Sequence, residues 1–162
     1  MALRTILTQG DPTLAKISRP VEKFDEKLHI LLDDMKETLA HANGAGLAAP
    51  QIGILRRVVL VVDADDEVLE LINPVLVYTE GEQTDLEGCL SVPGKYGFVT
   101  RPYKARVRAQ DRNGNTFEVD GEEIVARCFC HELEHLDGHL YVEHTDRLYT
   151  IEELQAMEAD DE

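Results

Sequence analysis

The sequence predicts an α+β fold in which antiparallel or mixed strands surround one central helix. Segment 122–137 has the length of a helix and carries apolar residues on most faces before its histidines, which is typical of a buried helix. Elsewhere, short segments rich in Val, Ile and Leu have the pattern of strands. No repeat or linker divides the chain, so we expect one domain over 1–162, with an acidic tail over 151–162.

The N-terminal part predicts a turn followed by an amphipathic helix. Asp11 and Pro12 are turn residues. Asp25 can cap a helix, because its side chain accepts a hydrogen bond from a free N–H of the first turn. The apolar residues that then fall on one helical face are Leu28, Leu31, Leu32, Met35 and Leu39. Asn43 and Gly44 end this helix, since both tolerate the left-handed backbone conformation.

Strands are predicted next. Segment 57–62 is almost continuously apolar after its arginine, which indicates a buried strand. Segment 68–78 predicts one or two more strands, broken near Asn73 and Pro74 because proline cannot donate a hydrogen bond to a neighbouring strand.

A hairpin is predicted after these strands. Segment 104–110 alternates charged and apolar residues, as a strand with one buried face does. Asn113 and Gly114 favour a tight turn, and 116–119 then forms the returning strand.

The central helix is predicted from its ends as well as from its apolar residues. Glu122 and Glu123 would lie in its first turn, where the helix dipole favours acids. Asp137 and Gly138 close it, with glycine suited to the left-handed cap.

The motif HExxH occupies residues 131–135 of this helix. Side chains four residues apart lie on one helical face, so His131 and His135 can reach one metal ion, and Glu132 is a candidate general base. The same motif also occurs by chance on charged helices, so a third ligand has to be found.

Three sources of a third ligand can be compared. The extended motif HExxHxxGxxH is not met, because Tyr141 occupies the position of its last histidine and His139 is out of register. A peptidase with a distant acidic ligand would have to use Glu152 or Glu153 of the tail. Cys89 is the better candidate, since a thiolate binds borderline and softer divalent ions well.

Three segments together resemble the signature motifs of the peptide deformylase family, in the same order. These segments are 44–51 (Gly-Ala-Gly-Leu-Ala-Ala-Pro-Gln), 87–91 (Glu-Gly-Cys-Leu-Ser) and 131–135. The resemblance implies a metal-dependent hydrolase that removes the formyl group from the N-terminal formylmethionine of newly made polypeptides and releases formate. In that family the third motif commonly has aspartate where this chain has Glu134.

The resemblance also implies the roles of individual residues. Cys89, His131 and His135 would hold one divalent ion, usually Fe2+, although Zn2+, Ni2+ or Co2+ can occupy such sites, and a water would take the fourth place. Glu132 would act as the base. The Gln51 side chain and the Leu90 backbone N–H would stabilise the oxyanion. The substrate would be bound by Gly44, Ala45, Gly46 and Cys128.

A non-enzymatic reading competes with this one. Cys128 lies three residues before His131, so a closed structural zinc site of two cysteines and two histidines is an alternative. Cys89 could also be a small buried apolar residue, and Gln51 could merely end a turn. Cys128 and Cys130 are otherwise expected to pack in the core.

One charged pair is a further hypothesis. Glu87 and Arg101 flank the Cys89 segment, and a bond between them would hold that segment in place. The alternative is that both are surface charges.

The composition predicts a cytoplasmic protein. Its 3 cysteines are an odd number, and residues 1–4 start no hydrophobic targeting segment. No apolar run is long enough to span a membrane. The net charge of -16 disfavours nucleic-acid binding, and the acidic tail 151–162 disfavours the ribosome docking that a basic C-terminal helix provides in some deformylases. Oligomeric state and substrate preference beyond formylmethionine stay open.

Overall fold

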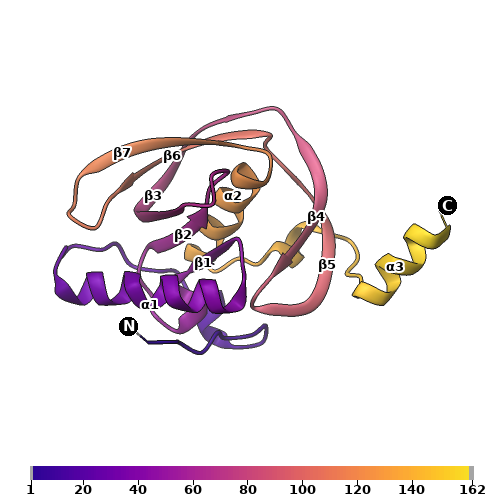
Figure 1. Cartoon of the computed structure of the whole chain (residues 1–162), viewed down its shortest axis with the longest axis horizontal. Helices are drawn as coiled ribbons and strands as arrows, with labels where there is room; N and C mark the ends of the chain where they lie inside the picture. Colours follow the sequence, from indigo (N-terminus) through magenta and orange to yellow (C-terminus); the bar gives the residue numbers. More distant parts are fainter. Residues whose placement is uncertain (1, 161–162) are drawn as a thin grey trace.

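Two antiparallel sheets and a central helix make up the fold (Figure 1). The computed structural model describes residues 2–160. The larger sheet has the strand order β1-β2-β3-β6-β7. Its strands are β1 Gly46–Ala48, β2 Val58–Val62, β3 Val68–Glu80, β6 Lys104–Gln110 and β7 Thr116–Glu122. A smaller sheet pairs β4 (Gln83–Cys89) with β5 (Val92–Arg101).

Helices pack on both faces of the larger sheet. The helices are α1 Glu26–Ala42, α2 Ile124–Leu136 and α3 Ile151–Asp160, with short 3-10 turns η1 Pro12–Ala15, η2 Ala49–Ile52 and η3 Tyr141–His144. Figure 1 shows α1 across one face and α2 enclosed by strands of both sheets. The predicted α+β fold with a central helix is therefore confirmed.

The core lies on both sides of β2. Val58 and Leu60 pack with α1, whereas Val59 and Val61 pack with α2, and all four side chains are fully buried. This explains the continuous apolar run in the sequence, because a strand that is covered on both faces has no polar side. The alternation of β2 side chains therefore places α1 on one face of the larger sheet and α2 on the other.

The predictions for α1, β2 and the hairpin are confirmed. The Asp25 side chain accepts a hydrogen bond from the Leu28 N–H at 3.2 Å, and Asn43 adopts the left-handed conformation with φ 55°. Asp11 likewise caps η1. Strands β6 and β7 pair from Lys104 to Gln110, joined by the turn at 111–115.

Of the one or two strands predicted in segment 68–78, the structure has one, and the break expected near Asn73 and Pro74 is a bulge within it. One strand, β3, runs from 68 to 80, and the ladder to β6 shifts register between Ile72 and Val75. Asn73 sits in this bulge with φ 52°, and its side chain bonds the backbone of Val21. The bulge accommodates the proline that the strand could not otherwise pair.

The central helix also starts later than predicted. Glu122 is the last residue of β7 and pairs with Lys104, and Glu123 turns the chain with φ 55°. The Glu123 carboxylate accepts a hydrogen bond from the Tyr103 hydroxyl at 2.8 Å instead of lying in the first helical turn. At the other end Gly138 has φ 83°, as expected for the residue after the cap.

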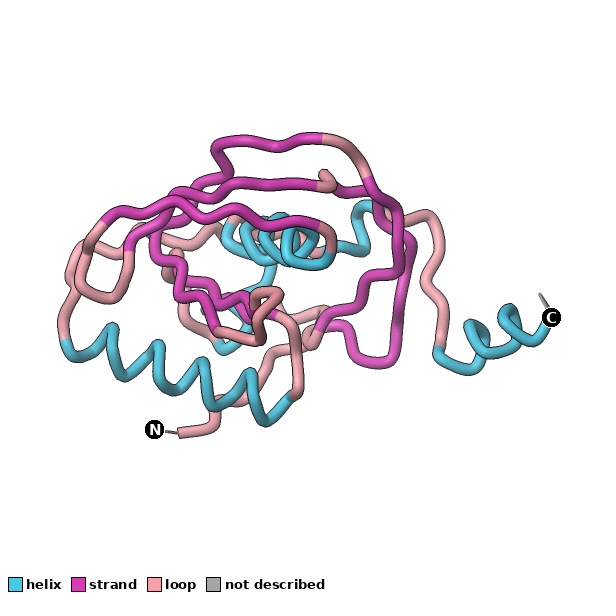
Figure 2. The backbone as a smooth tube through the Cα atoms, turned by 45° about the horizontal axis from the view of Figure 1, so that its top comes forward, coloured by secondary structure: helices cyan, strands magenta, loops and turns pink. Residues whose placement is uncertain are grey.

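The acidic tail forms α3, which stands apart from the rest of the molecule (Figures 1 and 2). Ile151 and Met157 on it are 48% and 41% exposed, so this helix adds little to the core. Residues 161–162 of the predicted tail lie outside the described residues. None of the helices in the described part of the chain has the length and apolar character needed to cross a bilayer. That residues 1–162 form a single domain stays a prediction.

Candidate metal centre and active site

Three possible metal ligands converge between α2 and the end of β4. One turn of α2 separates His131 from His135, and their ring centroids lie 5.0 Å apart. Cys89 ends β4, and its Sγ is 3.4 Å from His135 Nε2. One ligand atom from each of the three residues lies within 4.8 Å of those of the other two. Among the described residues, no other cysteine, histidine or acid joins this group.

The chemistry of this group fits a divalent metal ion. The Ser91 N–H and the Gln51 side-chain amide both point at the Cys89 sulfur, at 3.4 and 3.5 Å, which suits a thiolate. His131 and His135 are 7% and 1% exposed. Two imidazoles and one thiolate form a donor set that iron, zinc, cobalt or nickel can bind.

Glu132 lies beside this group and has no fixed partner for one of its oxygens. Its side chain is buried, and within the described residues Oε1 makes no hydrogen bond. Burial raises the pKa of Glu132 to about 7, while the neighbouring His131 opposes the rise. A Cβ at Gly46 would lie 2.6 Å from Glu132 Oε2, so glycine there leaves the carboxylate its place. Such a group can accept and return a proton near neutral pH.

Hydrogen bonds fix the orientation of the Gln51 side chain. Its Oε1 accepts a hydrogen bond from the Ala48 N–H at 2.8 Å, so its Nε2 must face the other way. Nε2 donates to Ser91 Oγ at 3.0 Å and reaches the Cys89 sulfur. The amide donor is thereby held at the edge of the cavity that Gln51 and Leu90 both line.

Glu87 and Arg101 form the expected ion pair, and both are buried, so the surface-charge alternative was wrong. Arg101 donates to both Glu87 oxygens at 2.8 and 3.1 Å, and Arg127 donates to one of them at 2.9 Å. The contact that sequence reasoning missed is His131 Nδ1, 2.7 Å from Glu87 Oε1.

The charges around Glu87 decide its protonation and that of His131. Burial alone would raise the pKa of Glu87, but the bonds from His131 and Arg101 outweigh it and lower the pKa to about 2. An ionised carboxylate only accepts hydrogen bonds, so His131 Nδ1 carries a proton. His131 Nε2 is then left free to bind a metal ion.

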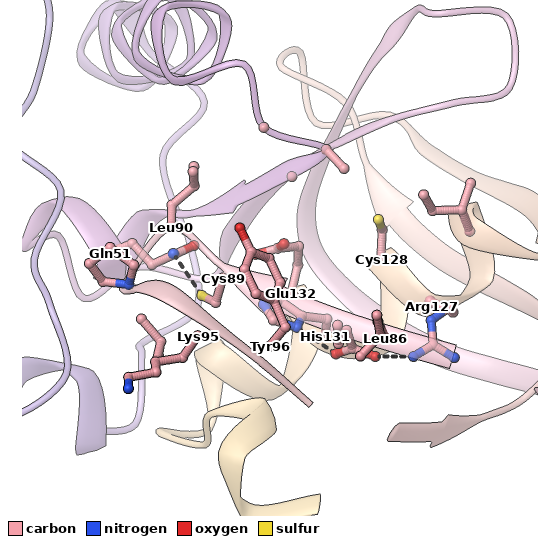
Figure 3. Close-up of a pocket in the computed structure, with 18 of the residues that line it drawn as sticks. Gln51, Leu86, Cys89, Leu90, Lys95, Tyr96, Arg127, Cys128, His131 and Glu132 are labelled. Atoms are coloured by element: carbon pink, nitrogen blue, oxygen red, sulfur yellow. Dashed lines mark hydrogen bonds and ion pairs between the residues drawn. The ribbon is translucent and has the colours of Figure 1, made fainter. Parts of the chain in front are cut away.

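A cavity of about 390 Å³ opens beside the three ligands (Figure 3). Its lining includes Gly44, Ala45 and Gly46, which precede and begin β1, and segments 88–90 and 92–96 of the β4–β5 hairpin. Figure 3 shows Cys128 and Arg127 at one end, with Gln51 and Cys89 at the other. The predicted substrate-binding residues Gly44, Ala45, Gly46 and Cys128 all line this one cavity.

Cys128 does not lie with the other ligands. It lines the cavity, and burial raises the pKa of its thiol to about 12, so it stays protonated. Cys130 is buried, as predicted. Glu152 is exposed on α3, and Glu153 pairs there with Arg147. Within the described residues the geometry therefore favours an open three-ligand site over the closed zinc site.

Two further contacts near the ligands were not foreseen. Glu134, on α2, bonds Arg101, and its other oxygen accepts a bond from His144 Nε2 at 2.5 Å. Tyr141, which occupies the position of the last histidine in the extended motif, stacks on His131 with ring centroids 5.9 Å apart. No local pattern marks either contact, because each joins residues ten or more positions apart.

The chain is similar to known proteins over almost its whole length. A family model described as polypeptide deformylase matches residues 3–150. A peptide deformylase of Agathobacter rectalis is 55% identical over 88% of this chain and 90% of its own length. One from Caldicellulosiruptor bescii is 52% identical over 96% and 93%.

Solved structures agree with these relatives. The crystal structure of a peptide deformylase from Legionella pneumophila has a TM-score of 0.86 and 42% identity, covering 97% of this chain and 92% of that one. The peptide deformylase from Ehrlichia chaffeensis in complex with actinonin has a TM-score of 0.87 and 32% identity, covering 98% and 96%. The chain therefore belongs to the polypeptide deformylase family, whose members are metal-dependent hydrolases that remove the formyl group from the amino terminus of polypeptides.

Proposed function

We propose that Cys89, His131 and His135 hold the divalent metal ion of this deformylase and that N-formylmethionyl nascent peptides are its substrates. The observation that carries the proposal is the convergence of these three side chains beside a cavity that Glu132 and Gln51 also line. The ion is Fe2+ in this proposal, with Zn2+, Ni2+ and Co2+ as substitutes. When bound, it supplies a Lewis acid that polarises the formyl carbonyl and lowers the pKa of water.

Glu132 moves the proton in this reaction. Its free Oε1 accepts a proton from the attacking water, and the carboxyl group then delivers that proton to the departing amine nitrogen. Because Gly46 has no Cβ, Oε2 keeps its place beside the ligands, and Oε1 is left for both transfers. The formyl C–N bond breaks, and formate and a free amino terminus are released.

Gln51 and Leu90 stabilise the charge that develops on the formyl oxygen. The bonds that hold the Gln51 carboxamide turn its Nε2 toward the metal ligands, and Leu90 follows Cys89 directly. Both donors are held in place before the reaction, which is why their effect exceeds that of water. Removing one such donor typically costs about 3 kcal/mol in the transition state.

The cavity accommodates the rest of the substrate. Three residues of small volume, Gly44 to Gly46, let an extended backbone lie close to the edge strand β1. The methionine side chain enters the end of the cavity at Cys128, whose protonated thiol offers an apolar surface. The substrate thus lies in the cavity between segment 44–46 and Cys128, with its formyl group at the metal.

The acidic helix α3 does not dock on the ribosome by attraction to RNA phosphates. Glu152, Glu153 and Glu158 on this helix are exposed and would be repelled by that surface. Cosedimentation with ribosomes at low salt checks this, and binding that is lost on removing α3 would contradict it.

Deformylation of a formyl-Met-Ala-Ser peptide tests the proposed function. Protein purified without oxygen is loaded separately with Fe2+, Ni2+ or Zn2+, and release of the free amine is followed. We expect metal-dependent turnover, and a loss of about a thousandfold in Glu132→Ala, which keeps its metal. An absence of turnover with every metal, in folded protein that binds one equivalent of metal, would contradict the proposal. Normal turnover by Glu132→Ala would show that Glu132 is not the base.

A further inference from the structure

One wall of the cavity, segment 93–96, has no partner in the β4–β5 ladder. Cys89 pairs with Val92 and Glu87 pairs with Gly97, so the four residues between bulge away from β4. Gly94 has φ 76°, which marks the sharp turn in this segment. All four residues line the cavity. Within the hairpin, Gly88 leaves room for the Tyr96 ring, and contacts from outside the hairpin supply the hydrogen bonds that the ladder does not.

The chain after α2 supplies those contacts. Tyr96 and Tyr149 exchange two backbone hydrogen bonds, at 2.9 and 2.7 Å. The hydroxyl of Tyr141 donates a hydrogen bond to the Lys95 carbonyl at 3.0 Å. Tyr141 is 1% exposed and belongs to a small apolar cluster with Val92, so its side chain has little freedom to move.

The ring of Tyr141 makes a second contact, which is separate from that of its hydroxyl. It stacks on the His131 ring with an interplanar angle of 26°. Glu87 holds His131 at Nδ1, and the imidazole plane can still tilt by small rotations of the side chain that keep this bond. A flat ring packed on its face limits this tilt.

We propose that Tyr141 is a positioning residue with two separable contacts. Its ring fixes the plane of His131 for the metal ion, and its hydroxyl fixes segment 93–96 for the substrate. The inference rests on the proposed function of the site. One side chain thereby couples the orientation of a metal ligand to the wall on which the peptide lies.

The variants Tyr141→Phe and Tyr141→Leu separate the two contacts. Tyr141→Phe keeps the ring and frees the Lys95 carbonyl, so we expect KM for formyl-Met-Ala-Ser to rise about fivefold while kcat and metal affinity are unchanged. Tyr141→Leu also loses the stacked ring, so its metal affinity, measured by competition with a chelator, falls about tenfold.

Tyr149→Phe is the matched control. It removes a hydroxyl from the same C-terminal stretch, and in the described residues that hydroxyl makes no hydrogen bond. Its backbone bonds to Tyr96 are untouched, so KM, kcat and metal affinity stay at the values of the unaltered protein.

Two results would overturn the inference. An unchanged KM in Tyr141→Phe would remove the role of the hydroxyl. Proton NMR of zinc-loaded protein reads the ring contact without relying on Tyr141→Leu to fold: the His131 ring protons are expected to show an upfield ring-current shift in both the unaltered protein and Tyr141→Phe, and its absence would remove the role of the ring. Neither chelator competition nor NMR needs turnover, so these results stand apart from failure of the proposed function.

Discussion

The larger sheet and the β4–β5 hairpin are built in different ways. The larger sheet is covered on both faces, and the side chains of β2 from Val58 to Val61 are fully buried. Within the described residues, Val92 and Val99 of the hairpin form a small buried apolar cluster with Tyr141 of η3, and buried charges around Glu87 hold the hairpin to α2. The larger sheet therefore provides most of the apolar core, whereas the hairpin brings Cys89 and the charge of Glu87 to the ligands on α2.

Leu60→Ala tests the first half of this contrast and has the largest expected effect. Leu60 is fully buried between α1 and the sheet, so its truncation leaves a cavity that costs about 3 kcal/mol of unfolding free energy. Urea denaturation measures this loss, and kcat at temperatures below unfolding is unchanged. The control Val75→Ala, at a position 55% exposed on β3, costs less than about 0.5 kcal/mol. A similar loss in both variants would break the contrast.

Glu87→Gln tests the second half. The amide keeps the shape of the side chain but loses the negative charge that Arg101, Arg127 and His131 share. We expect metal affinity to fall about 10- to 100-fold, because the orientation and basicity of His131 are no longer fixed. Chelator competition measures it, with Asp85→Asn, an exposed acid two residues earlier on the same strand, as control. Unchanged affinity would mean that the buried charges serve only the fold.

Glu134→Gln sharpens the comparison with a smaller effect. Glu134 acts on the hairpin only through Arg101, and its side chain is 25% exposed, so solvent screens its charge. Metal affinity should fall about threefold, less than in Glu87→Gln. Glu143→Gln, which alters an exposed pair with His139, serves as the control. A loss as large as that of Glu87→Gln would place the supporting charge on α2 instead of the hairpin.

The same contrast explains which elements could be predicted. Strand β2 and helix α1 bury whole faces, so their apolar periodicity is visible in the sequence. The hairpin carries Gly88, Gly94 and Gly97 and alternates poorly, because only a few of its side chains reach a core. Its two strands were not predicted, although the Cys89 segment within them was singled out by its chemistry.

The candidate site could be predicted only in part for a related reason. The ligand spacing of His131 and His135 is local to one helix, and Cys89 was proposed from the affinity of a thiolate for such metal ions, before the resemblance to a family motif supported it. The stacking of Tyr141 on His131 and the bond from His131 to Glu87 depend on the tertiary fold. Residues distant in sequence meet there, and the periodicity of the sequence does not indicate which of them come into contact.

The absorption spectrum of the cobalt-substituted protein tests most directly the claim that the hairpin completes the metal centre of α2. With Cys89 as the one sulfur ligand, we expect a thiolate-to-cobalt charge-transfer band of single-thiolate intensity, lost in Cys89→Ser and unchanged in Cys128→Ser. A band that survives in Cys89→Ser, or that weakens in Cys128→Ser, would contradict the account.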